Sequence, residues 1–204
     1  TSKTFTRTGG AMRNISVPAN SKMATVTVQD RYGNQSTPVM FINGVPADLD
    51  GEITADFIPD EVLRQAIMEQ AGPTLRDMLD YKGELDISGL AVTDLTGLNL
   101  MTGITSLNIA NTQVSDLTPL AGLSALERLD ASNVQITSLT AGMLPESLTY
   151  LDISDNTKLT TIGKDALAAL EQLNELYLTD CPALETLYLH DTNITFFSID
   201  GCTS

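Results

Sequence analysis

Acidic and tyrosine side chains recur at regular positions in this sequence of 204 residues. Asp130 and Asp152 stand at matching positions of the similar segments LDAS and LDIS, and Asp86 stands in an earlier LDIS segment. The residues that we expect to contact a partner are Asp86, Asn108, Asp130, Tyr150, Asp152, Asp155, Tyr177 and Asp180. Such a negative stripe suits a basic patch or a hydrated cation. For each residue alone an alternative stays open, because aspartate and serine also keep an exposed strand solvated.

Catalytic chemistry has little support in the sequence. His190 is the only histidine, and Asp191 beside it makes no triad without a nucleophile in the right geometry. The sequence has no Gly-x-Ser-x-Gly segment, no histidine and cysteine group with zinc spacing, and no phosphate-binding loop. We therefore predict no catalytic residue, no metal site and no cofactor. We expect His190 in an exposed strand, LYLHD, away from the acidic residues.

A repeat places the expected site residues on one surface. Leu107, Leu129 and Leu151 open similar segments at equal spacing, and Leu85 falls one period earlier. In the repeat that starts at Leu107, the apolar positions are Leu107, Ile109, Val114, Leu117, Leu120, Leu123 and Leu126. This spacing is neither helical nor a long alternation, and a fixed period in the low twenties predicts a leucine-rich repeat solenoid. Because adjacent coils lie about 4.8 Å apart, the site residues would form columns on a concave parallel sheet.

The last two periods differ from the others. The period from Leu151 to Leu176 is longer than the regular one, and its segment KDALAALEQL predicts a convex helix over residues 164–173. The following coil, from Leu176 to Phe197, is slightly shorter than the regular period and divides into two similar halves.

Charge is distributed unevenly along the chain. Residues 1–50 carry five lysines and arginines against three acids, and residues 51–204 carry six against 23, which gives net charges of +2 and −17. This asymmetry predicts a boundary near residue 50. An acidic surface disfavours nucleic acid as a partner. The sequence has no apolar run long enough to span a bilayer, so we expect no membrane insertion.

The part of the chain ahead of Glu84 predicts a β-rich segment followed by a helical cap. Residues 14–18, 22–29 and 38–42 are short β-rich runs, and residues 30–34 supply turn residues between the last two. After an acidic connector, Pro59 to Ala71 predicts a helix whose apolar face is Val62, Leu63, Ala66 and Ile67. Gly72-Pro73 ends it, and a second short helix over 74–81 follows.

Two segments resemble a known family. IPDEVLRQAI ahead of LDISGL is similar to the helical N-terminal cap of bacterial internalin-type leucine-rich repeat proteins, and VSDLTPLAGLSALERLDASNVQIT is similar to their repeat. The stretch ATVTVQDRYGNQSTPVMFI resembles the closing hairpin of immunoglobulin-like or fibronectin-like modules. The family resemblance implies a bacterial secreted or surface-attached protein whose repeats bind a protein or a glycan.

The chain departs from that family's repeat at one inward position. The position that usually holds asparagine reads Leu90, Thr112, Val134, Asn156, Cys181 and Cys202. Coils without asparagine must satisfy the turning backbone in another way. The two cysteines resemble the cysteine ladder of bacterial surface repeats, and we expect them to be buried free thiols rather than a disulfide.

The sequence therefore predicts an α/β fold: a leucine-rich repeat solenoid with a parallel concave sheet. The expected parts are a β-rich segment over 1–50, which could be a remnant of an immunoglobulin-like module, a helical cap over 51–83, and repeats over 84–204 that are truncated at the C-terminal end. We expect a monomeric, extracellular or cell-surface binding module for a protein or glycan ligand, and no enzyme. The alternatives are a structural spacer and an accessory domain of a larger surface hydrolase.

Overall fold

The computed structural model describes residues 2–6, 23–29, 39–42 and 45–202. The chain forms two compact units, Thr1–Gly51 and Glu52–Ser204. The first unit contains a four-stranded sheet. Its strands, in hydrogen-bonded order, are β1 (Ser2–Thr6), β2 (Met23–Gln29), β3 (Val39–Ile42) and β4 (Val45–Ala47).

In this sheet β1 and β2 run parallel, whereas β2–β3 and β3–β4 are antiparallel. The strands predicted over 22–29 and 38–42 are confirmed as β2 and β3. The β1 strand was not predicted, because SKTFT is short and carries a single large apolar residue. The predicted strand over 14–18 and the turn over 30–34 lie outside the described residues.

Two helices begin the second unit, as the sequence predicted. Helix α1 (Glu61–Ala71) has Asp60 as its N-cap and ends at Gly72, whose φ of 119° suits glycine. Helix α2 (Leu75–Asp80) begins with a capping box between Thr74 and Asp77. Leu63, Ala66 and Ile67 are buried, but Val62 is 37% exposed. Its assignment to the apolar face was wrong, because it lies at the margin of the buried stripe.

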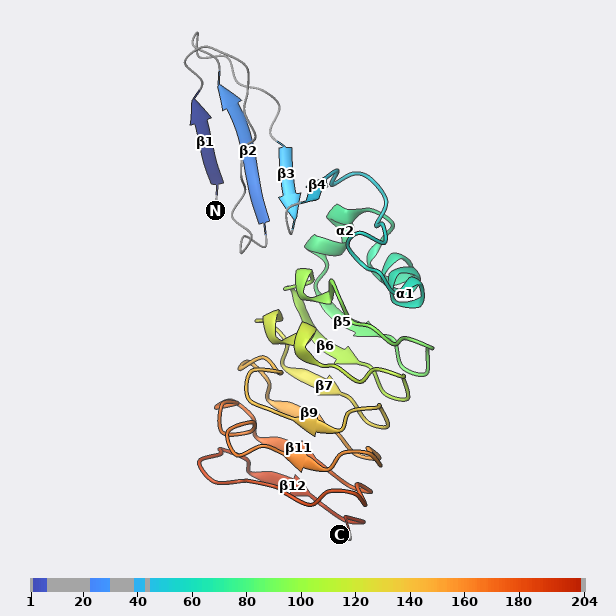
Figure 1. Cartoon of the computed structure of the whole chain (residues 1–204), viewed down its shortest axis with the longest axis vertical. Coiled ribbons are helices and arrows are strands. Elements are labelled where there is room, and N and C mark those ends of the chain that lie inside the picture. Colours follow the sequence, from blue (N-terminus) through green and yellow to red (C-terminus); the bar gives the residue numbers. More distant parts are fainter. Residues whose placement is uncertain (1, 7–22, 30–38, 43–44, 203–204) are drawn as a thin grey trace. The chain divides into compact units, whose positions relative to one another are not determined.

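A six-stranded parallel sheet runs through the rest of the second unit (Figure 1). Its strands are β5 (Gly83–Asp86), β6 (Ile104–Asn108), β7 (Arg128–Asp130), β9 (Tyr150–Asp152), β11 (Glu175–Tyr177) and β12 (Phe196–Ser198). Each strand pairs with the equivalent positions of the next coil, so that Leu107 lies opposite Leu129 and Leu129 opposite Leu151. The predicted solenoid and its register are confirmed.

The return segments of the coils close a leucine-rich core. They contain the short 3₁₀ helices η1 (Leu98–Leu100) and η2 (Thr118–Gly122), and a second parallel pair, β8 (Ser138–Leu139) with β10 (Thr161–Ile162). All seven apolar positions predicted for the coil from Leu107 are buried. Burial of this continuous apolar interior stabilises a fold whose coils otherwise contact only their neighbours.

Two predicted elements of the late coils are wrong. Residues 164–173 form a series of turns instead of a convex helix. The Leu170 amide donates to the Leu167 carbonyl, and the Leu173 amide donates to the Leu170 carbonyl. Each of these bonds spans three residues, whereas α-helical bonds span four. Ala166, Leu167, Leu170 and Leu173 are nevertheless buried as predicted. The second half-repeat, LYLHD, contains no strand, and only Thr186 ahead of it forms an isolated bridge, with Thr161. Tertiary packing over a short span overrides the helical spacing here.

The predicted inward position behaves as expected in the middle coils. Thr112, Val134, Asn156 and Cys181 are buried. The Val134 amide donates to Oδ1 of Asn156 in the next coil, at 3.0 Å. The asparagine of one coil thus satisfies the backbone of the neighbouring coil that lacks it. Leu90 is 38% exposed, and its inward assignment was wrong. It stands in the first coil, which has a neighbouring coil on one side only.

Candidate functional site

The outward side chains of the six strands form two columns on the open face of the parallel sheet, which we call the sheet face. The first column consists of Glu84, Ser106, Arg128, Tyr150, Glu175 and Phe196. The second consists of Asp86, Asn108, Asp130, Asp152, Tyr177 and Ser198. Six of the eight predicted site residues stand in these columns, at the register the repeat predicted.

The acidic members of the second column also have a structural task. Asp130 Oδ1 accepts hydrogen bonds from the backbone amide and the hydroxyl of Ser132, at 3.0 and 2.7 Å. Asp86 and Asp152 accept from the amide two residues on in the same way. These turns satisfy the backbone where each strand ends. The aspartates are therefore fixed in orientation, and each still brings a negative charge to the sheet face.

Asp155 and Asp180 do not lie in the two columns. They occupy the corner after each strand, where the backbone turns through the left-handed region, with φ of 60° and 51°. Asn111 and Asn133 adopt the same conformation, and glycine holds the corner in the first and last coils. Glycine, asparagine and aspartate tolerate this geometry best, which explains their residue types without a ligand. Both aspartates are exposed, so they add charge beside the sheet face.

An aromatic row crosses four adjacent strands of the sheet face. The guanidinium carbon of Arg128 lies 3.9 Å from the centre of the Tyr150 ring. The Tyr150 and Tyr177 rings are 5.2 Å apart, and the Tyr177 and Phe196 rings are 5.1 Å apart, with tilts of 41° and 40°. Tilted rings at this separation attract one another, and a guanidinium over a ring face adds a cation–π contact. We call Arg128, Tyr150, Tyr177 and Phe196 the aromatic row.

The sequence indicated only part of this row. Tyr150 and Tyr177 were expected site residues, whereas Arg128 and Phe196 were not. The repeat period predicts the column in which each residue of the row stands, but it does not predict the contacts between their side chains. Tyr177 stands in the second column, and its ring lies between two residues of the first. A signal was available in the sequence: three aromatic residues occur at outward positions of consecutive strands.

The electrostatics of the row follow from its surroundings. Partial burial raises the pKa of the Tyr150 hydroxyl, and the charges of Asp152 and Asp130 raise it further, while Arg128 lowers it. The phenol is therefore neutral at physiological pH and able to donate a hydrogen bond. The row thus offers apolar ring surface and a hydroxyl donor, flanked by carboxylates.

Two family models match the chain. The leucine-rich repeat domain of the endo-beta-N-acetylglucosaminidase EndoS matches residues 58–120, and a general leucine-rich repeat model matches residues 124–182. This chain is a leucine-rich repeat protein. The matched ranges include the helical cap and the coils from β5 to β11. No curated protein matches the sequence.

Several solved structures are similar to this leucine-rich repeat chain. One contains CBM51-2 with GlcNAc and the INT domains of Clostridium perfringens ZmpB, at 35% identity over 47% of this chain and 21% of that one, with a TM-score of 0.37. An internalin, InlF, from Listeria monocytogenes is 18% identical over 71% of this chain and 57% of that one, with a TM-score of 0.49. InlJ of Listeria monocytogenes, whose functional domain includes a cysteine ladder, is 15% identical over 76% and 63%, with a TM-score of 0.31. This chain thus spans about a fifth of the first of these proteins and just over half of the second.

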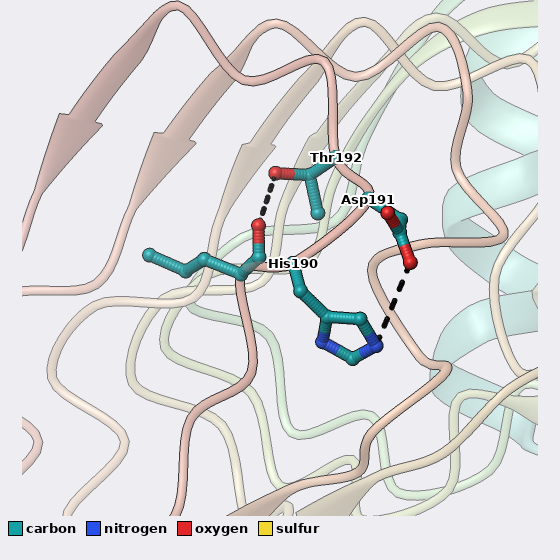
Figure 2. Close-up of polar contacts among 4 residues, drawn as sticks. His190, Asp191 and Thr192 are labelled. Atoms are coloured by element: carbon teal, nitrogen blue, oxygen red, sulfur yellow. Dashed lines mark hydrogen bonds and ion pairs between the residues drawn. The ribbon is translucent and has the colours of Figure 1, made fainter.

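His190 lies apart from the sheet face of the leucine-rich repeats (Figure 2). It stands in a turn rather than in the predicted strand, and its Nε2 is 3.9 Å from Oδ2 of Asp191. Both side chains are exposed, and the Thr192 hydroxyl donates to the carbonyl of Leu189 instead of facing the imidazole. The expected exposure of His190 is confirmed. The described residues bring no nucleophile to this pair.

The two cysteines occupy the inward position of the last two coils. Both are free thiols, as expected, and Cys181 is buried. Burial raises the pKa of the Cys181 thiol to about 11. Cys202 is only half-buried, so the prediction of a fully buried pair was wrong for this residue. It belongs to the last coil, where β12 is the end strand of the sheet.

Among the described residues, no group of three or more histidines, cysteines or acids is arranged to hold a metal ion. No helix formed by these residues is both long and apolar enough to cross a bilayer.

Proposed function

We propose that this chain is a binding module of a bacterial secreted or cell-surface protein, and that its sheet face recognises a protein or a glycan. The site residues of this proposal are the predicted ones, Asp86, Asn108, Asp130, Tyr150, Asp152, Asp155, Tyr177 and Asp180, joined by Arg128 and Phe196. The module acts by equilibrium binding, without catalysis. It works as a monomer outside the cell.

The observation that carries this proposal is the aromatic row. Tyrosine, phenylalanine and arginine are enriched at interfaces, where their large surfaces supply most of the binding free energy. Here four such residues lie in contact across β7, β9, β11 and β12 on the open side of a regular sheet. Folding alone does not require them there, because the core beneath is built from leucine and isoleucine.

The repeat architecture supports the same proposal. A solenoid presents an extended surface on which side chains from successive coils converge, and binding is the general use of such surfaces. One family model is the leucine-rich repeat domain of an endo-beta-N-acetylglucosaminidase. This match favours a second candidate function, in which the chain is an accessory domain of a larger hydrolase and helps it to hold its substrate.

A binding screen against host surface proteins and glycan arrays, at low and high ionic strength, tests the proposal. A hit on the sheet face should weaken about tenfold or more in Tyr177→Ala, since a truncated aromatic hot spot costs about 2 kcal/mol. The matched control is Tyr188→Ala, an exposed tyrosine outside the strands of the sheet. Binding that is unchanged in Tyr177→Ala would favour a structural spacer instead, and so would a blank screen at high protein concentration.

A further inference from the structure

The aromatic row has two ends with different surroundings. At the β7 end, the Arg128 guanidinium covers Tyr150. At the β12 end, the Phe196 side chain is 47% exposed. One end is thus closed by a cation of the protein itself, and the other presents the most exposed ring of the row.

The charge around the exposed end favours a cation as well. In the strand register, Glu175 lies directly beside Phe196, and Asp152 lies directly beside Tyr177. Residues 52–204 carry 23 acids against six lysines and arginines, a net charge of −17. A positively charged partner is therefore attracted over a long range and then meets a carboxylate next to an open ring. A neutral sugar gains nothing from this charge.

We propose that the Phe196 end of the row binds an arginine or lysine side chain of a basic protein partner, between the Phe196 ring and the Glu175 carboxylate. This inference rests on the proposed function and narrows its ligand to a basic protein segment. Arg128 over Tyr150 provides the internal precedent, since that contact places a guanidinium over a ring of the same row. The cation of the partner would contact the Phe196 ring as the Arg128 guanidinium contacts the Tyr150 ring.

The test uses the full chain and three probes in calorimetric titration: hexa-arginine, hexa-citrulline and chitohexaose. Citrulline keeps the shape of arginine and removes its charge. We expect hexa-arginine to bind at low ionic strength, to weaken with salt, and to outcompete hexa-citrulline. Phe196→Leu, which keeps apolar bulk and removes the ring, should weaken hexa-arginine by roughly two- to fivefold. Glu175→Gln should weaken it similarly, and Tyr188→Ala should leave it unchanged.

Arg128→Ala gives an opposite expectation that sharpens the test. Removing the internal guanidinium uncovers the Tyr150 ring and deletes a repelling charge, so hexa-arginine should bind roughly two- to fivefold more tightly. A variant that merely damaged the fold would not gain affinity. A thermal melt of each variant verifies that the repeats remain folded.

Three results would overturn the inference. Hexa-arginine could bind with the same affinity to Phe196→Leu, which would reduce the attraction to net charge alone. Hexa-citrulline could bind as well as hexa-arginine, or no cationic probe could bind at all. If chitohexaose bound instead and required Phe196, the ligand class would be wrong, while the proposed binding role of the sheet face would stand.

Discussion

Asp60 and Thr93 join the helical cap to the first coil. The carboxylate of Asp60 accepts at Oδ1 from the Leu63 amide of its own helix, at 3.0 Å, and at Oδ2 from the amide and hydroxyl of Thr93, at 2.9 and 3.1 Å. A third amide, from Asp94, also reaches Oδ2. One side chain thus caps α1 and satisfies the backbone of a distant segment of the chain.

Asp60→Ala should destabilise the second unit by about 1 kcal/mol or more, because it removes an N-cap and the hydrogen bonds that two exposed amides of the first coil donate to this carboxylate. Urea denaturation followed by circular dichroism measures the change. Asp56→Ala, an exposed aspartate ahead of the same helix, is the control and should fall within about 0.5 kcal/mol of the parent. An equal effect of both variants would contradict the bridging role.

The same carboxyl predicts an acid-dependent loss of stability. Partial burial raises the pKa of Asp60, but the hydrogen bonds from Thr93, Leu63 and Asp94 outweigh this effect, so the pKa lies below its ordinary value of 3.8. A folded-state pKa below the unfolded one stabilises the fold above pH 3.8, and this contribution disappears as pH falls through the folded pKa. Unfolding followed from neutral to strongly acidic pH should therefore depend less on pH in Asp60→Asn than in the parent.

The solenoid could be predicted from the sequence because the same spacing of leucines recurs in several consecutive coils. Leucines at equal spacing fixed both the strand register and the two outward columns, and a single error in one coil would have conflicted with the others. Prediction was wrong for the inward position of the first and last described coils. Leu90 is 38% exposed and Cys202 is half-buried, and the repeat period alone does not show such differences between coils.

The contacts of the candidate site were less predictable than its positions. Strand register placed Tyr150 and Tyr177 in different columns, and only the rotamers of long side chains bring their rings together. The helix predicted over 164–173 failed for a related reason. Its apolar spacing matched a helix, but a short return segment between two coils buries the same residues with successive turns.

Gln70 of α1 pairs with β5, the strand at the capped end of the sheet. Its side-chain amide donates to the Asp86 carbonyl, at 2.6 Å, and accepts from the Asp86 amide, at 3.0 Å, so it takes the place of a neighbouring strand. Gln70→Ala should expose these groups and raise the hydrogen-exchange rate of the Asp86 amide by about tenfold, with a loss of about 1 kcal/mol. Glu69→Ala on the same helix is the control. Unchanged exchange at Asp86 would show that water caps the edge equally well.

Asn156 should be the most sensitive polar residue of the core. Its Nδ2 donates to the carbonyls of Ala131 and Ile153, and its Oδ1 accepts from the Val134 amide, all in a fully buried environment. Asn156→Ala leaves several buried backbone groups unpaired and should cost about 3 kcal/mol or more. Thr112→Val is the matched comparison at the equivalent position of an earlier coil. It loses one bond, to the Ile109 carbonyl, and should cost about 1 kcal/mol. Equal losses in urea denaturation would contradict the role of Asn156 as the link between coils.

Cys181 and Cys202 should differ in reactivity although they occupy the same repeat position. The thiolate is the reactive form, and burial raises the pKa of Cys181 to about 11 from an ordinary 9.0. Iodoacetamide at mildly alkaline pH should therefore alkylate the half-buried Cys202 at least about tenfold faster than Cys181, as peptide mass spectrometry would measure, and denaturant should abolish the difference. Equal rates in the native protein would mean that the last two coils open readily.

The raised pKa of Cys181 also makes the stability of the fold depend on pH. The stabilising contribution of the protonated thiol is complete below pH 9.0 and is lost as pH rises through about 11. Cys181→Ala should therefore lessen the alkaline fall in stability.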